Sequence, residues 1–256
     1  MFYKELNEMK LRVLIVFAVL IMALVVTVVM RPYAAQMMEE MAGQLEQLPD
    51  FLKNLIGDVS SLTRLNDDDY YLISQWQGKN FGQFLPFVVL LIAFPIFAKE
   101  FDKKTIYFLL SRKNRKDVFR VKYFTGMAAV LAVTALLSLL GPLFMNLAGY
   151  STGFIYSLKA LLQQAAGAVF FYALFTLLSV SSRDQVRPVV FGIVIVIGLP
   201  IIGIIDAISW LNPYPFILAS NIAQSENIDW IYLGALVAIT AVLTAVDYKI
   251  FERKEL

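Results

Sequence analysis

The sequence predicts an all-α polytopic membrane protein with six transmembrane helices. Hydrophobic residues make up 59% of the 256-residue chain, whereas soluble domains have about 45–50%. Charged residues make up only 16% and occur in blocks, and the apolar runs between these blocks are long enough to cross a bilayer. The alternating segments of a membrane β-barrel are absent. Because backbone polar groups must be paired inside hydrocarbon, the spans are expected to be helices.

The predicted spans follow the apolar runs in chain order. The first lies in residues 1–30, after a short N-terminal elbow, and it is longer than the apolar region of a typical signal peptide. The other five spans are residues 81–98, 123–147, 156–180, 188–205 and 230–246. Residues 1–256 therefore form a single transmembrane domain in this prediction.

The distribution of Lys and Arg predicts the orientation. Three of the 22 basic residues lie near the N-terminus, nine in residues 99–122, two in residues 181–187 and three near the C-terminus, which leaves five elsewhere. Cytoplasmic loops carry the excess of basic residues, so both termini are expected in the cytoplasm, which requires an even number of spans. Trp76, Trp210 and Trp230 then fall near the outer interface, as in an aromatic belt.

Two segments outside the spans are expected on the outer side. In residues 31–80, apolar residues recur at helical spacing from Met37 to Leu48, a second short helix is expected at Phe51–Ile56, and Asp67 to Asp69 could cap a third helix that runs to Trp76. This segment is expected to be a small helical extracellular insertion. Residues 206–228 are apolar but interrupted by proline, which is typical of half-helices that dip into a membrane.

Composition excludes several kinds of chemistry. The chain contains neither Cys nor His, which removes thiol nucleophiles, zinc sites with these ligands and Ser-His catalysis. No phosphate-binding loop is present, because Ile73 and Asn80 stand where that motif requires Gly and Ser or Thr around Gly78-Lys79. We expect no catalytic residue, no metal or directly bound cofactor, and no nucleic-acid partner.

The segment Lys99–Tyr123 is the most informative part of the sequence. Ile106, Leu109 and Leu110 give one helical face an apolar stripe, and a basic turn at residues 112–116 leads into the third span. This pattern predicts an amphipathic cytoplasmic helix over residues 99–122. The pattern alone leaves two interpretations open: a helix that lies on anionic lipid headgroups, or a lever that docks into a partner protein.

The same segment carries a family resemblance. Glu100, Lys104-Thr105-Ile106, Leu109-Leu110-Ser111, Arg115 and Lys122-Tyr123 resemble the ABC-2 permease family, the transmembrane subunits of type V-like ABC exporters. The family pattern there is E…G-T-[IL]…L-L-S-x-P-[VI]-[ST]-R…K. The closing AVDYKIFERKEL is also similar to the family's F-E-[RK]-[RK]-[DE]-[LI]. Lys104 stands where the family usually has Gly, and Asn114 stands near a common Pro.

The resemblance implies a function and partners. It implies an export permease in a bacterial or archaeal type of plasma membrane, a separate ABC ATPase subunit that binds ATP and Mg, and a second permease chain, identical or similar. It places a coupling helix in residues 99–122 and a second ATPase contact in residues 181–187. The residues it assigns to ATPase coupling are Glu100, Lys103, Lys104, Thr105, Leu109, Leu110, Ser111, Arg112, Arg115, Arg183 and Arg187.

Polar residues inside apolar spans are candidates for the transport pathway, because they are costly in hydrocarbon and often functional. They are Asn146, Gln163, Gln164 and Asp206. The two glutamines could instead form interhelical hydrogen bonds, and Asp206 could lie at a helix end.

Two other functions are compatible with the sequence. The chain could be a non-transporting membrane anchor or sensor of an ABC-type complex, acting through residues 31–80. A secondary transporter is the other alternative, although that class usually shows internal repeats and several buried charges. Co-purification with an ATPase separates permease from secondary transporter, and stimulation of ATP hydrolysis by a cargo separates permease from sensor.

Overall fold

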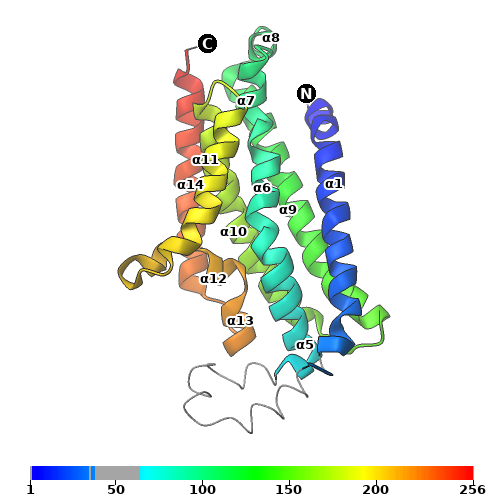
Figure 1. Cartoon of the computed structure of the whole chain (residues 1–256). Helices are drawn as coiled ribbons and strands as arrows, with labels where there is room; N and C mark the ends of the chain where they lie inside the picture. The colour runs from blue at the N-terminus through cyan, green and yellow to red at the C-terminus, as the bar shows by residue number, and fades with distance from the viewer. Residues whose placement is uncertain (1, 35, 38–63, 256) are drawn as a thin grey trace.

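The computed structural model describes residues 2–34, 36–37 and 64–255. Within this part the elements are helices and turns, without a strand. The long helices run side by side as a bundle, and both ends of the chain lie at one end of it, at the top of Figure 1. We call this the termini end and the opposite one the far end. The helices predicted within residues 38–48 and 51–56 lie outside the described residues.

The apolar runs of the sequence form the long helices. Among the described residues, five helices are long and apolar enough to cross a membrane. They are α1 (Phe2–Val29), the continuous rod Asp68–Asp102, α9 (Arg115–Leu147), α10 (Phe154–Ser181) and α14 (Trp230–Arg253). The apolar helix α11 (Val186–Ile202) is shorter, with 17 residues. The prediction of a polytopic helical membrane protein is thus confirmed, whereas the count of six spans stays a prediction.

The second span is longer than predicted. It begins with α5 (Asp68–Tyr71) and continues through the π-helix η2 (Leu72–Gly82), α6 (Gln83–Ala93) and α7 (Pro95–Asp102). Asp67 caps the start as predicted, because its side chain accepts hydrogen bonds from the backbone N–H groups of Asp69 and Tyr70 at 2.8 and 3.1 Å. The helix does not stop near Trp76, however, since the apolar residues that follow keep it inside the bundle.

The placement of Trp76 in an aromatic belt is wrong. Its side chain is fully buried, and its indole Nε1 donates to the carbonyl of Leu137 on α9 at 3.1 Å. Gly141 makes room for it, since a Cβ at that position would lie 2.7 Å from the indole ring. A buried Trp whose N–H finds a partner gains from packing without an unpaired donor.

The segment 99–122, predicted as an amphipathic helix followed by a basic turn at residues 112–116, is divided further in the structure. The end of α7, the short helix α8 (Ile106–Leu110) and the start of α9 share this segment. Lys104 ends the first part, because its φ of +57° is left-handed and cannot continue a right-handed helix. Asn114 is extended, so α9 begins at Arg115, eight residues before the predicted start of the third span. Its φ of −63° is also the value that a proline would impose.

Helix α10 lies in the middle of the bundle, where it packs against α6, α7, α9 and α14. The outer helices are far less covered: in the most apolar window, 56% of α10 is buried but only 28% of α1 and 17% of α14. The apolar residues on the outer faces of α1 and α14 are therefore available to lipid or to another chain.

Three short helices lie at the far end between α11 and α14. They are η3 (Asp206–Leu211), α12 (Tyr214–Ile217) and α13 (Ser220–Ser225). Phe216 and Ile217 are buried against the bundle, whereas η3 has no buried residue. Figure 1 shows α12 and α13 tucked against the lower part of the long helices, with η3 projecting away. These interrupted helices fall in the segment for which re-entrant half-helices were predicted.

The left-handed backbone at Lys104 leads to a test. Replacing Lys104 with Gly should stabilise the fold by about 0.5–1 kcal/mol, because Gly adopts positive φ without the steric cost that a Cβ causes. The matched control is Lys103→Gly, at a right-handed φ of −83°, which should destabilise. Thermal unfolding of the purified variants in detergent measures both effects, and a Lys104→Gly variant less stable than the parent would contradict this reading of the turn.

Candidate functional site

A buried ion cluster joins three helices at the termini end. Lys122 of α9 is only 2% exposed, and its Nζ lies 2.8 Å from both carboxylate oxygens of Glu5 on α1. The same Nζ lies 2.8 Å from Oε1 of Glu100 on α7. Both carboxylates are themselves buried, so the lysine is charge-paired on two sides where water is excluded. We call Glu5, Glu100 and Lys122 the ion cluster.

A more exposed set of charges surrounds the ion cluster. Lys4 lies 3.3 Å from Glu100 and 3.4 Å from Glu8, and Lys99 lies 2.5 Å from Glu8. Two of these contacts, Lys4–Glu100 and Lys99–Glu8, again pair α1 with α7. The start of α1 is therefore fixed to α7 and α9 by charge pairs in addition to apolar packing.

The ion cluster also fixes the turn before α8. The hydroxyl of Thr105 donates to Oε2 of Glu100, the carboxylate oxygen that Lys122 does not bind. The left-handed Lys104 turns the chain so that Thr105 can reach back to α7. Glu100 and Thr105, both assigned to coupling from the sequence, thus lie in direct contact, and they connect α8 to the ion cluster.

The apolar stripe on α8 points into the protein. Ile106 is buried, and Leu109 and Leu110 are partly buried against the hydrophobic core. The exposed side of α8 instead carries Tyr107 and Phe108, which are 52% and 59% exposed. The sequence reasoning missed these two aromatic residues, although their positions directly between the stripe residues indicated them.

Basic residues surround this exposed aromatic pair. The guanidinium of Arg112 lies 4.2 Å from the centre of the Phe108 ring, and the Ser111 hydroxyl donates to the Phe108 carbonyl. Several further cations of this segment are exposed, namely Lys103, Lys104, Lys113 and Lys116. The exposed surface of α8 and its flanking turns is therefore aromatic at its centre and positively charged around it.

The loop between α10 and α11 lies against the same region. Gln185 donates to the carboxylate of Asp102 at the end of α7, at 2.7 Å. Arg183 lines a groove together with Lys104 and Tyr107. Arg187 is instead 68% exposed and pairs with Asp184 within its own turn at 3.1 Å. The structure therefore brings Arg183, but not Arg187, next to the α8 segment.

Residues 251–254, at the end of the last helix, connect the start of α9 to the loop between α10 and α11. Arg115, at the start of α9, donates to the carbonyls of Phe251, Glu252 and Lys254 at 2.9–3.1 Å. A guanidinium in this position satisfies carbonyls that a helix end leaves free. Lys254 in turn donates to the carbonyls of Val180 and Ser182 at the end of α10. Burial, with a smaller effect from Arg183, lowers the pKa of Lys254 to about 8.

A groove of about 500 Å³ opens where these elements meet. Its lining comes from α7, α8, the α10–α11 loop and the end of the chain, and consists of Phe101, Asp102, Lys104, Ile106, Tyr107, Arg183, Lys254 and Glu255. Its lining combines apolar side chains with charges of both signs, a composition that suits a protein-binding surface. We call this groove, together with the exposed side of α8, the termini-end face.

The four candidate pathway residues do not form one site. Asn146 holds the turn between α9 and α10, since its side chain bonds both the N–H and the carbonyl of Thr152 at 3.0 and 3.1 Å. Asp206 is exposed on η3. Gln163 and Gln164 are both fully buried on α10 in the far half of the bundle.

Sequence reasoning missed a buried carboxylate on α14. Asp247 is fully buried, and neither of its oxygens has a hydrogen-bond partner among the described residues. Its occurrence just after a long apolar run was the available signal, because an ionisable residue in a membrane helix is a default candidate for function.

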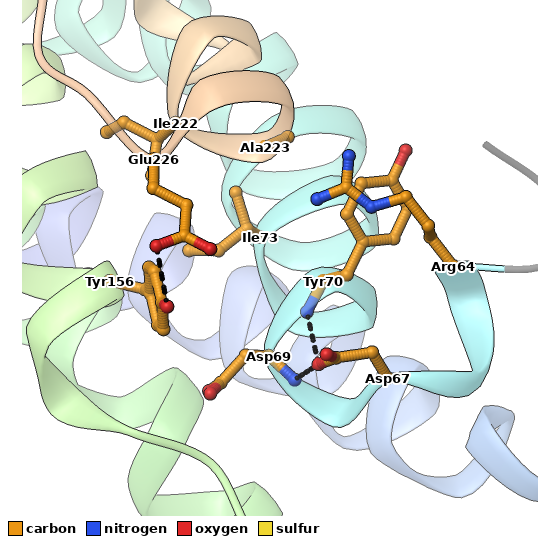
Figure 2. Close-up of a pocket in the computed structure, with 9 residues that line it drawn as sticks. All are labelled: Arg64, Asp67, Asp69, Tyr70, Ile73, Tyr156, Ile222, Ala223 and Glu226. Atoms are coloured by element: carbon orange, nitrogen blue, oxygen red, sulfur yellow. Dashed lines mark hydrogen bonds between the residues drawn. The ribbon is translucent and has the colours of Figure 1, made fainter. Parts of the chain in front are cut away.

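A small polar pocket lies at the far end. It has a volume of about 60 Å³ and lies between the start of the second span, α10 and α13. Figure 2 shows Asp67 and Asp69 on one side of it and Glu226 on the other, bonded to the hydroxyl of Tyr156 at 2.9 Å. The space is small compared with the roughly 300–1,000 Å³ of typical pockets for small organic ligands.

A family model described as "ABC-2 family transporter protein" matches residues 2–256. No curated protein and no solved structure matches the chain.

Removal of the central lysine of the ion cluster should be costly. Lys122→Met leaves two buried carboxylates without their cation and should destabilise the fold by about 3–5 kcal/mol. The control Lys116→Met, on the exposed side of the same helix, should change stability by less than about 0.5 kcal/mol. Denaturant unfolding of the purified proteins measures both, and equal stability of the two variants would show that the ion cluster does not hold the helices together.

Proposed function

We propose that this chain, which belongs to the ABC-2 transporter family, is the membrane-spanning permease subunit of an exporter driven by a separate ATPase subunit. Family membership follows from a match over nearly the whole chain, and the chain is a multi-pass helical membrane component of an ABC transporter. The outward direction of transport, the coupling to an ATPase and the plasma membrane location belong to the proposal.

The termini-end face carries the proposal. It gathers into one surface the two loops that the family resemblance assigns to ATPase contact. Gln185 bonds Asp102 across the two loops, and Lys254 bonds the end of α10 while its ammonium lies 3.9 Å from the Phe101 ring. A partner that docks here would therefore contact one connected surface.

The charge of this face predicts the chemistry of the partner surface. Exposed Lys and Arg residues surround Tyr107 and Phe108. An acidic partner surface with an apolar socket would complement it, because charge complementarity steers association while buried aromatic residues supply most of the affinity. The positive-inside rule assigns such a basic face to the cytoplasm, where ATP and Mg are available to the ATPase.

The contacts of α8 suggest how motion passes into the membrane. Displacement of α8 by the docked ATPase would act on Glu100 through Thr105, and from Glu100 on α1 and α9 through Lys122. Three spans would then move together. The permease would bind its cargo differently in its inward-facing and outward-facing states, and this difference would release the cargo outward. A ligand can shift a conformational equilibrium only if its affinity differs between the two states.

A second permease chain completes the proposed transporter. Most of α1 has an uncovered apolar surface, with Leu11, Val19 and Met22 at least 60% exposed. Ala18 on the same helix is exposed and small enough to let another helix approach closely, whereas Ala23 packs partly against the core of its own chain. We propose α1 as the contact between two copies or between this chain and a similar one, with lipid covering the remaining apolar surface. Six spans with both termini in the cytoplasm fit this arrangement.

Replacing the exposed aromatic pair tests ATPase docking. The double variant Tyr107→Ser/Phe108→Ser should weaken association with the ATPase by about tenfold or more, because each aromatic side chain contributes about 1.5–3 kcal/mol when it is buried. The fold should be retained, since both side chains are exposed. Co-purification of the ATPase from the native membrane, followed by titration of the purified subunits, measures this loss.

The matched control is Phe154→Ser, an exposed aromatic residue at the far end of the bundle, which should leave association unchanged. Leu109→Asp/Leu110→Asp, in contrast, should disturb the protein itself, because these side chains pack against the core. Undiminished ATPase association and transport in the Tyr107→Ser/Phe108→Ser variant would rule out docking through α8.

A further inference from the structure

Five fully buried polar side chains lie together in the far half of the bundle, where η2, α9 and α10 meet. They are Gln77, Ser138, Ser157, Gln163 and Gln164, each 0% exposed. None of them is ionisable. We call these five residues the buried polar patch.

Part of the buried polar patch is well bonded. The amide of Gln77 donates to the Ser138 carbonyl at 2.9 Å and accepts from the Ser138 hydroxyl at 3.1 Å. Gln164 donates to the main-chain carbonyl of Gln77 at 2.8 Å. That carbonyl belongs to the π-helix η2, a form of helix that is frequent at functional sites.

The remainder of the buried polar patch is unpaired. Four polar atoms have no hydrogen-bond partner among the described residues: Nε2 and Oε1 of Gln163, Oε1 of Gln164 and Oγ of Ser157. Buried polar groups in native proteins are nearly always bonded, and each exception requires an explanation. Here the unpaired atoms include donors and acceptors but no charge.

Gln163 faces the short helices α12 and α13. It lies on α10 between Ala160 and Gly167, three and four residues away, and therefore on the same helical face. Ala160 packs with Ala219 and Ile222, and a Cβ built on Gly167 would lie 3.7 Å from Cβ of Ile217. Both neighbours of Gln163 on this face thus contact α12, α13 or the turn between them.

The glycines of η2 let the same short helices lie close on the other side. A Cβ on Gly78 would lie 3.0 Å from the Leu218 carbonyl oxygen, and one on Gly82 would lie 3.1 Å from the Ile217 carbonyl oxygen. The turn between α12 and α13 therefore rests on both elements that carry the glutamines.

Helix α13 has strained backbone at both ends and is held to α10 by solvent-exposed hydrogen bonds. Ala219 before it and Glu226 after it have φ of +54° and +60°, a region that costs energy for residues other than Gly and that persists mainly at functional sites. At its end, Glu226 is held by the Tyr156 hydroxyl at 2.9 Å, as Figure 2 shows, and by Lys159 on its carbonyl at 2.8 Å. Both bonds are solvent-exposed and can exchange with water.

We propose that α12 and α13 form a movable cover, and that beneath it the buried polar patch binds neutral hydrogen-bonding groups of the cargo, such as amides or hydroxyls. The absence of ionisable residues among the five disfavours ionised groups, which would be left without a counter-charge. This inference rests on the proposed transport function. Water offers the same hydrogen bonds, so a resident water molecule is the alternative occupant.

Stability measurements on the purified chain distinguish these occupants without the ATPase. If Gln163 is kept for a transient ligand, Gln163→Leu removes two unpaired polar atoms and should raise the melting temperature by about 2–4 °C. The matched control Gln164→Leu loses the bond to Gln77 and should lower it. A lower melting temperature for Gln163→Leu would identify a resident structural water and overturn the ligand site.

Thiol labelling tests the movable cover in the complete complex. The chain has no Cys, so Gln163→Cys can report alone. A membrane-impermeant maleimide added from outside should label it at least tenfold faster during ATP hydrolysis than without ATP. Thr134→Cys, a buried control one turn deeper on α9 than Ser138, should stay unlabelled.

Unchanged protection of Gln163→Cys while the complex hydrolyses ATP would overturn the movable cover. Failure of any ATPase to co-purify would instead count against the proposed function itself.

Discussion

The burial of Lys122 between Glu5 and Glu100 is the interaction on which the rest of the termini end depends. Removing these three charges from water is expensive, and only close pairing offsets that cost. The carboxylates come from α1 and α7 and the ammonium from α9, so no two of these helices can shift apart without exposing or unpairing a charge. Apolar packing alone would allow the helices to slide, because it has no directional requirement.

From this constraint the shape of the termini-end face follows. Glu100 uses its second oxygen to hold Thr105, and this contact together with the left-handed Lys104 sets the direction of α8. The inward stripe of α8 then meets the core, which leaves Tyr107 and Phe108 exposed. Arg115 and Lys254 fasten the start of α9 and the ends of α10 and α14 to the same region. These contacts make the termini end one rigid unit. At the far end, in contrast, the bundle is closed by short helices that are held by solvent-exposed hydrogen bonds.

Local sequence patterns were sufficient to predict where the helices lie in the sequence, but they did not predict the contacts between helices. Apolar runs predicted the long helices, and Asp67 predicted a cap, because both depend on neighbours in sequence. The break at Lys104 was missed because the side chain alone does not reveal a positive φ, although the family's Gly at this position was a signal. Trp76 was misplaced because its burial depends on Gly141 and Leu137 of another helix. Lys122 and Glu5 are 117 residues apart, a pairing that no local pattern encodes. Among the candidate site residues, Glu100 and Thr105 are in contact. Asn146 lies at the end of α9, where its side chain holds the following turn, and Asp206 is exposed on η3.

The rigidity of the termini end can be measured directly by the distance between spin labels in the complex with the ATPase. Tyr3→Cys on α1 and Lys113→Cys between α8 and α9 are both exposed and belong to different elements that the ion cluster is proposed to hold together. Their distance distribution should be the same with and without ATP, while a far-end pair, Ser151→Cys with Ser225→Cys, should shift in the same samples. A shift or splitting of the Tyr3–Lys113 distance on ATP binding would contradict the claim that the ion cluster makes α1, α7, α8 and α9 move as one body.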